Sequence, residues 1–166
     1  MLRGGCDEGK GTTGGGKDFC VGLTPLHAAS KNGHAPAVRQ LLQYGASADL
    51  RELSDEGSGL TPLHYACKNG HADAAAALLQ AGVDINAAAG DVRTPSGSTP
   101  LHLACANGSF KLVEVLLGRH PSGTCDFEAK DGAGNTPLDI ANDKSHDHIG
   151  NLIQKKIGQY TTYSRL

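Results

Sequence analysis

The sequence predicts an all-α fold in which helix-turn-helix units stack in a row. A motif that begins with Thr-Pro-Leu occurs four times, with its threonine at positions 24, 61, 99 and 136, about 37 residues apart. Each copy is followed by a turn signal and then by a second apolar-periodic run. Aromatic residues make up only 4% of the chain, which suits thin layers of alanine and leucine. Repetition at this period indicates an array in which each unit is stabilised by its neighbours.

The first helix of each unit has a marked beginning and end. Threonine is a favoured N-cap residue, and the proline after it has a preset φ at a position where no intrahelical N–H bond is needed. A glycine stands two residues before each threonine, and we expect it to adopt a positive φ in the turn that enters the helix. Asn-Gly then ends the helix in the first three units, and Lys144-Ser145-His146 is the weaker equivalent in the fourth.

The second helix of each unit is predicted by apolar residues at i, i+3 and i+4 spacing, such as Val38, Leu41 and Leu42 in the first unit. This spacing places them on one face of an amphipathic helix. A long stretch then leads from each second helix to the next threonine, and we expect it to project as a finger.

Together these motifs resemble ankyrin repeats. The resemblance is carried by Thr-Pro-Leu-His-x-Ala, Asn-Gly-His, the paired leucines, the segment 82–86 (GVDIN) and the segment 126–138 (DFEAKDGAGNTPL). It implies a solenoid of stacked helix-turn-helix units with projecting β-hairpin or loop fingers. The usual period is about 33 residues, so these units are a few residues longer. The extra residues fall inside the first two fingers and before the third.

The chain divides into three predicted parts. Residues 1–16 are Gly-rich and polar, and we expect a flexible arm. The ankyrin-repeat domain covers residues 17–157, with repeats at about 17–45, 46–83, 84–121 and 122–157. Residues 158–166 show no apolar period and are expected to form a short C-terminal tail. The polar residues of the fourth unit are those expected of a terminal repeat.

The arm contains two near matches to a phosphate-binding loop, and both have the pattern G-x-x-x-x-G-K. Gly11 or Asp18 replaces the hydroxyl residue that should bind Mg²⁺, and no apolar strand precedes either match. An enzyme or nucleotide-binding protein that uses this arm is therefore the alternative that the sequence disfavours.

The histidines repeat in phase with the units. His27, His64 and His102 each stand three residues after a capping threonine, so we expect them to hydrogen-bond the threonine and neighbouring backbone. Cys67 and Cys105 also share one position and are expected to be small buried residues. The five cysteines are an odd number without CxxC spacing. We therefore predict no enzyme activity, no catalytic residue, no cofactor and no metal.

The predicted function is protein–protein interaction, as an adaptor, scaffold or stoichiometric inhibitor. The net charge of −2 disfavours nucleic acid as the partner. Neither a secretory signal nor a membrane span is recognisable, so we expect a cytoplasmic or nuclear monomer that binds another protein and no membrane.

The resemblance implies that the residues before each Asn-Gly turn and those on the finger tips face the partner. Two interpretations of the acidic first finger stay open: a solvated loop, or a device that steers a basic segment of the partner. The candidate protein-binding residues are Lys31, Asn32, Glu52, Asp55, Glu56, Tyr65, Lys68, Asn69, Arg93, Ala106 and Asn107.

Overall fold

The structure, a computed structural model, describes residues 19–53, 59–90, 97–118 and 125–163, and within them it forms four helix pairs and two short strands. The elements in chain order are β1 (Phe19–Val21), α1 (Pro25–Lys31), α2 (Ala35–Gln43), β2 (Arg51–Leu53), α3 (Pro62–Lys68), α4 (Ala72–Gln80), α5 (Pro100–Asn107), α6 (Phe110–Leu116), α7 (Pro137–Asp143) and α8 (Asp147–Tyr163).

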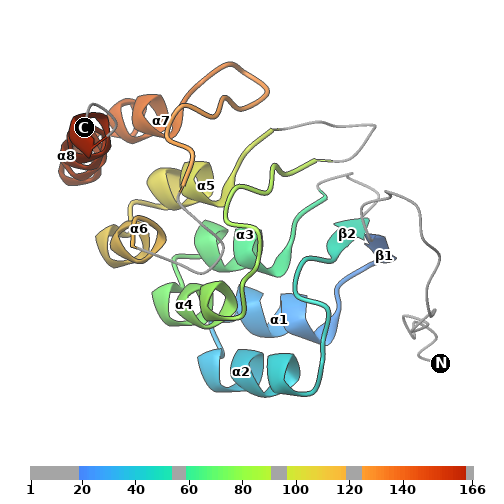
Figure 1. Cartoon of the computed structure of the whole chain (residues 1–166). Helices are drawn as coiled ribbons and strands as arrows, with labels where there is room; N and C mark the ends of the chain where they lie inside the picture. Colours follow the sequence, from blue (N-terminus) through green and yellow to red (C-terminus); the bar gives the residue numbers. More distant parts are fainter. Residues whose placement is uncertain (1–18, 54–58, 91–96, 119–124, 164–166) are drawn as a thin grey trace.

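The helix pairs stack in two rows, as Figure 1 shows. Helices α1, α3, α5 and α7 contact one another in turn and form the inner row, while α2, α4, α6 and α8 form the outer row. The connecting segments project beside the inner row. The predicted all-α repeat solenoid is therefore confirmed.

The fingers differ from one another at their bases. Strands β1 and β2 pair in parallel, with Phe19 opposite Arg51, so the first finger joins the stretch that precedes α1. The second finger closes on itself, because Ala89 N donates to Ser98 O at 2.7 Å and Gly97 N donates to Ala89 O at 3.0 Å. The residues at the first two finger tips, 54–58 and 91–96, lie outside the described part of the chain.

The motif that opens each unit forms the predicted helix start. The hydroxyl of Thr24 accepts a hydrogen bond from His27 N at 3.3 Å, and that of Thr61 accepts one from His64 N at 3.4 Å. A proline occupies the first turn of each inner helix. The glycines that precede the threonines all have positive φ, as predicted: Gly22, Gly59, Gly97 and Gly134.

The core is a continuous layer of leucine, alanine and cysteine between the two rows. Leu63 and Leu101 of the inner row are 0% and 1% exposed, and Leu78 and Leu112 of the outer row are fully buried. Complete burial of such a side chain stabilises the fold by about 1.5–3 kcal/mol. In the fourth unit the equivalent Leu138 is only half-buried, as expected of a terminal unit.

Helix α8 is longer than the sequence indicated. We expected a tail from residue 158, but the helix continues to Tyr163. Ile149 and Ile153 are buried, and Ile157 packs against the core one turn later. Once these contacts hold the helix, each further residue adds a backbone hydrogen bond at little entropic cost. The domain boundaries themselves stay a prediction.

The Asn-Gly-His turn joins neighbouring units as well as ending a helix. Gly33 has a φ of +72°, and a Cβ there would lie 2.5 Å from Nδ1 of His71 in the next unit. Nε2 of His71 donates to Lys31 O at 3.1 Å, and Nδ2 of Asn69 donates to the same oxygen at 2.9 Å. In the third unit Nδ2 of Asn107 donates to the carbonyl of the preceding inner helix at 3.1 Å. The turn therefore provides the last carbonyl of one inner helix with partners from the next unit.

Gly33→Ala should destabilise the protein more than Gly45→Ala. Both glycines have positive φ, but nothing lies within 4 Å of a Cβ at Gly45. Each change should cost about 1–2 kcal/mol of left-handed strain, and Gly33→Ala should add about 1 kcal/mol because it displaces His71 from its hydrogen bond. Urea unfolding of the two variants measures the difference. Equal losses would mean that the His71 contact contributes nothing.

The first unit contains a buried hydroxyl without a partner. Ser30 is 0% exposed, and its Oγ makes no hydrogen bond. Cys67 and Cys105 occupy the same position in the next two units and are also fully buried. An unsatisfied buried hydroxyl is destabilising, whereas a thiol behaves as a small hydrophobic group.

Ser30→Cys should therefore raise the free energy of unfolding by about 1 kcal/mol, and the reverse change Cys67→Ser should lower it by a similar or larger amount. Denaturant unfolding under reducing conditions tests both variants. A loss of stability in Ser30→Cys would contradict the interpretation of Ser30 as an unsatisfied group.

Candidate functional site

The first set of polar side chains is the row of threonine–histidine pairs. Nδ1 of His27 lies 2.8 Å from Oγ1 of Thr24 and accepts from Thr24 N at 3.3 Å. Its Nε2 faces the carbonyls of Leu50 and Leu60 at 3.0 and 3.2 Å. Since a carbonyl only accepts, the proton sits on Nε2. The histidine thus joins the start of its own helix to the following finger.

The same pairing recurs in the next two units. His64 donates from Nε2 to Ser98 O at 3.2 Å, and His102 donates to Asn135 O at 3.0 Å. Nδ1 of each ring lies 2.8 Å from the threonine hydroxyl of its own unit. The predicted hydrogen bonds between histidine, threonine and neighbouring backbone are confirmed.

Burial keeps the imidazoles of His27 and His64 neutral. The pKa of His64 is lowered to about 4, mainly by burial; the carbonyl of Ser98 opposes this shift, and the nearby Arg51 cation adds to it. Burial also lowers the pKa of His27, although the carbonyls of Leu60 and Leu50 oppose the shift. A second proton would have to enter at Nδ1, where it would meet the threonine N–H.

The fourth unit replaces this histidine with Asp139. Its Oδ2 accepts hydrogen bonds from Thr136 N at 2.9 Å and from Thr136 Oγ1 at 2.7 Å. These two hydrogen bonds lower the pKa of the carboxyl group. Asp139 is exposed, and its carboxylate side chain has no N–H with which to reach a further finger. The helix start is thus conserved in form, while the link to a following unit is missing.

The base of the first finger buries two charged residues. Arg51 and Glu52 are 8% and 4% exposed. Nη1 of Arg51 donates to the carbonyls of Gly59 and Ala88, so it ties the first finger to the second. Glu52 offers almost no surface to a partner, which contradicts its expected position on an accessible acidic finger. Periodicity could not reveal this, because the burial depends on how two fingers meet.

Three further candidates lie outside the described residues. They are Asp55, Glu56 and Arg93. Their predicted part in binding stays a prediction.

The other candidates lie together along the inner row. Six of them are exposed at the carboxyl ends of α1, α3 and α5: Lys31, Asn32, Lys68, Asn69, Ala106 and Asn107. We call this set the inner-row surface. Asn69 and Asn107 also carry the hydrogen bonds between units that are described above, so part of this surface is fixed by the stack itself.

Tyr65 sits beside the inner-row surface rather than projecting from it. Its side chain is only 9% exposed. The ring meets that of His27 edge-on at 5.9 Å between centroids, and Nζ of Lys31 lies 5.9 Å from its centroid. Tyr65 therefore supports Lys31 from the next unit, a role that the sequence did not reveal.

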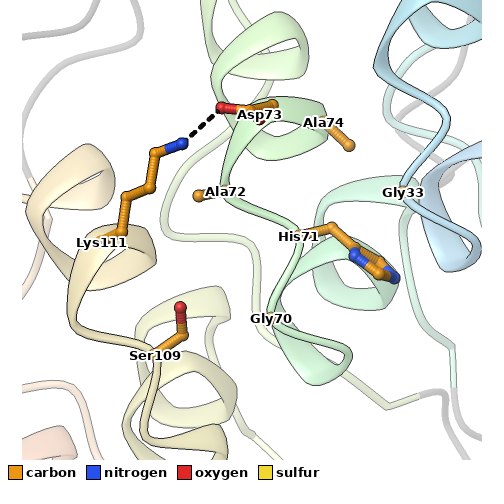
Figure 2. Close-up of a pocket in the computed structure, with 8 residues that line it drawn as sticks. All are labelled: Gly33, Gly70, His71, Ala72, Asp73, Ala74, Ser109 and Lys111. Carbon is orange, nitrogen blue, oxygen red and sulfur yellow. Dashed lines mark hydrogen bonds and ion pairs between the residues drawn. The ribbon is translucent and has the colours of Figure 1, made fainter.

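A shallow polar hollow lies at the interhelix turns, as Figure 2 shows. Lys111 reaches across it and pairs with Asp73 at 2.9 Å, while the ring of His71 points toward Gly33. The charged groups are thus paired with each other, and an exposed pair of this kind contributes at most about 1 kcal/mol. The lining is Gly33, Gly70, His71, Ala72, Asp73, Ala74, Ser109 and Lys111.

The buried thiols are free. Cys67, Cys105 and Cys125 are all buried and unpaired in the part of the chain that the structure describes. Burial raises the pKa of Cys105 and of Cys125 to about 12, and it also raises that of Cys67. Over residues 19–53, 59–90, 97–118 and 125–163, no group of three His, Cys, Asp or Glu residues is suited to hold a metal ion.

The stacked units, their threonine–histidine pairs and their turns define a repeat protein whose exposed inner row is continuous. Comparison with known families agrees: a family described as ankyrin repeats (3 copies) matches residues 2–89, and one described as ankyrin repeats (many copies) matches residues 63–117. The chain belongs to the ankyrin repeat family. A search of curated proteins found no match.

Ankyrin repeats are generally modules for protein–protein interaction, and the family is typically not enzymatic. The first match begins at residue 2, inside the segment expected to be a flexible arm. Among the helices of the described residues, none is long and apolar enough to cross a membrane.

Acid should destabilise the protein through His64 and His27. Their pKa values are lowered on folding, so the unfolded chain binds more protons and stability falls as the pH drops below about 6.5. Between about pH 7 and pH 5, His64 alone should account for a loss of about 2 kcal/mol.

The measurement is urea unfolding of the parent and of His64→Asn at about pH 7 and pH 5. Both values lie above the range in which most carboxylates protonate. The variant will be less stable at each pH, but its loss on acidification should be smaller. An unchanged pH dependence would show that His64 is not buried in its neutral form.

Proposed function

We propose that this protein is an adaptor, scaffold or stoichiometric inhibitor that binds another protein along its inner-row surface. The observation that carries the proposal is the position of six exposed candidate residues at the ends of three consecutive inner helices. Hydrogen bonds from Asn69 and Asn107 to the preceding units hold this surface in place. A preformed surface loses little conformational entropy on binding, which favours affinity.

The alternative is an enzyme or nucleotide-binding protein that uses the Gly-Lys arm. The described residues lend it no support, because His27, His64 and His102 are all engaged in joining helices to fingers. The arm itself lies outside the described residues.

We also propose a reducing compartment, the cytoplasm or the nucleus, and a monomeric state. The free thiols of Cys67, Cys105 and Cys125 support the choice of compartment, since disulfides persist mainly in oxidising environments.

Blocking the inner-row surface should abolish partner capture. Ala106 is exposed on α5, and Ala106→Trp adds bulk there without adding charge. Gln80→Trp places the same side chain on the exposed end of outer helix α4 and serves as the control. The assay is affinity capture from a cell extract followed by mass spectrometry, with equal melting temperatures as a check on folding.

We expect proteins captured by the parent and by Gln80→Trp to be lost from Ala106→Trp. If Ala106→Trp captured the same proteins in the same amounts, the binding site would not be the inner row.

A further inference from the structure

Two rows of side chains run along the inner helices. An apolar row holds the fourth residue after each capping threonine: Ala28, Tyr65, Leu103 and Ile140. A second row stands three positions later, at Lys31, Lys68, Ala106 and Asp143. Residues three apart on a helix are neighbours on its surface. Nζ of Lys31 lies over the ring of Tyr65, so the second row of one unit reaches the apolar row of the next.

The charge of the second row changes along the stack. Its members in the first two units, Lys31 and Lys68, are exposed cations, whereas Ala106 of the third unit is neutral. Asp143 in the fourth unit is followed by the exposed Lys144, so the two offset each other. The fixed positive charge of the inner row therefore belongs to the first two units.

The two lysines are available to an anion from outside. Lys111 pairs with Asp73, and no ion pair within the described part of the chain involves Lys31 or Lys68. Nζ of Lys31 lies 5.9 Å from the centroid of the Tyr65 ring, and this cation–π contact leaves the charge of the ammonium group unneutralised. Glu52, an acidic candidate from the sequence, is buried in the finger base.

The large apolar side chains of the third and fourth units are more accessible than Tyr65, and the small Ala28 of the first unit is also half-buried. Tyr65 is buried, but Leu103 and Ile140 are half-buried and so present part of their surface. Packed helices lie about 8–10 Å apart, and an extended chain rises about 3.3 Å per residue. An extended segment that crosses the inner row therefore meets successive units with about every third residue.

We infer that the inner row binds an extended acidic segment of a partner protein, with carboxylates placed on Lys31 and Lys68 and apolar side chains placed on Leu103 and Ile140. This inference rests on the proposed function and assigns its partner chemistry. The negative charge of this inferred segment is opposite to that of the basic segment which an acidic first finger would attract.

The test is direct binding of labelled synthetic peptides, measured by fluorescence anisotropy. The acidic probe has two glutamates about three residues apart, followed at the same spacing by two leucines. A second peptide carries the same residues in the reverse order, so that both chain directions are tested. The matched probe replaces the glutamates by lysines. We expect the acidic probe, in one direction, to bind at least about tenfold more tightly than its lysine counterpart, and its affinity to fall with salt.

The double variant Lys31→Glu with Lys68→Glu should lower the affinity for the acidic probe at least about tenfold and raise that for the lysine probe. The control is Arg39→Glu with Lys155→Glu, which makes the same change in net charge on exposed residues of α2 and α8. It should bind the acidic probe like the parent. Equal losses of affinity in both double variants would show that binding of the acidic probe depends only on the net charge of the protein, and would overturn the inference.

The failure of this inference can be told apart from that of the proposed function. If Ala106→Trp abolishes capture of natural partners while both probes bind equally, the inner row binds proteins but the acidic chemistry is wrong. Tighter binding of the lysine probe than of the acidic probe would mean that the inner row prefers a basic segment, and it would overturn the inference. Binding of a single-stranded RNA oligonucleotide that is lost in the Lys31 and Lys68 variant, without binding of the acidic probe, would make the anion a nucleic acid and also overturn the inference.

Discussion

The hydrogen bonds of the buried histidines are the interaction on which the stack depends. Each ring accepts from the threonine that starts its own helix and donates to a carbonyl of the following finger, as His64 does to Ser98. One side chain therefore sets both the start of a helix and the position of the next connection. Because burial holds His27 and His64 in the neutral form, their hydrogen bonds are sensitive to protonation. The fingers and the inner row take their positions from them.

A second set of contacts fixes the opposite end of each inner helix. The glycine of the turn lets the ring of His71 approach Gly33 closely, and Asn69 bonds the carbonyl of Lys31. Each unit is thus held to its neighbour at both ends of the inner helix. The exposed residues at the carboxyl ends of these helices form a surface that is ready before any partner arrives, and this is the physical basis of the proposed function.

The charge of that surface follows from a balance between exposure and burial. Lys31 and Lys68 stay exposed at the helix ends, while Arg51 and Glu52 are buried at the junction of two fingers. The sequence alone counts all four as finger or groove charges. Only the burial of Arg51 and Glu52 in the folded structure separates the charges that a partner can meet from those that hold the fingers together.

The sequence by itself determined the repeat, the helix starts and the histidine pairs, because each depends on residues within one unit, as with Thr61, Pro62 and His64. The tertiary structure decided what depends on contact between units. It buried Glu52, set Arg51 across two fingers, placed Tyr65 under Lys31 and left Ser30 without a hydrogen-bond partner. The contacts of Arg51 with Ala88 and of Lys31 with Tyr65 join residues more than 30 positions apart, and local periodicity carries no information about how neighbouring units are aligned.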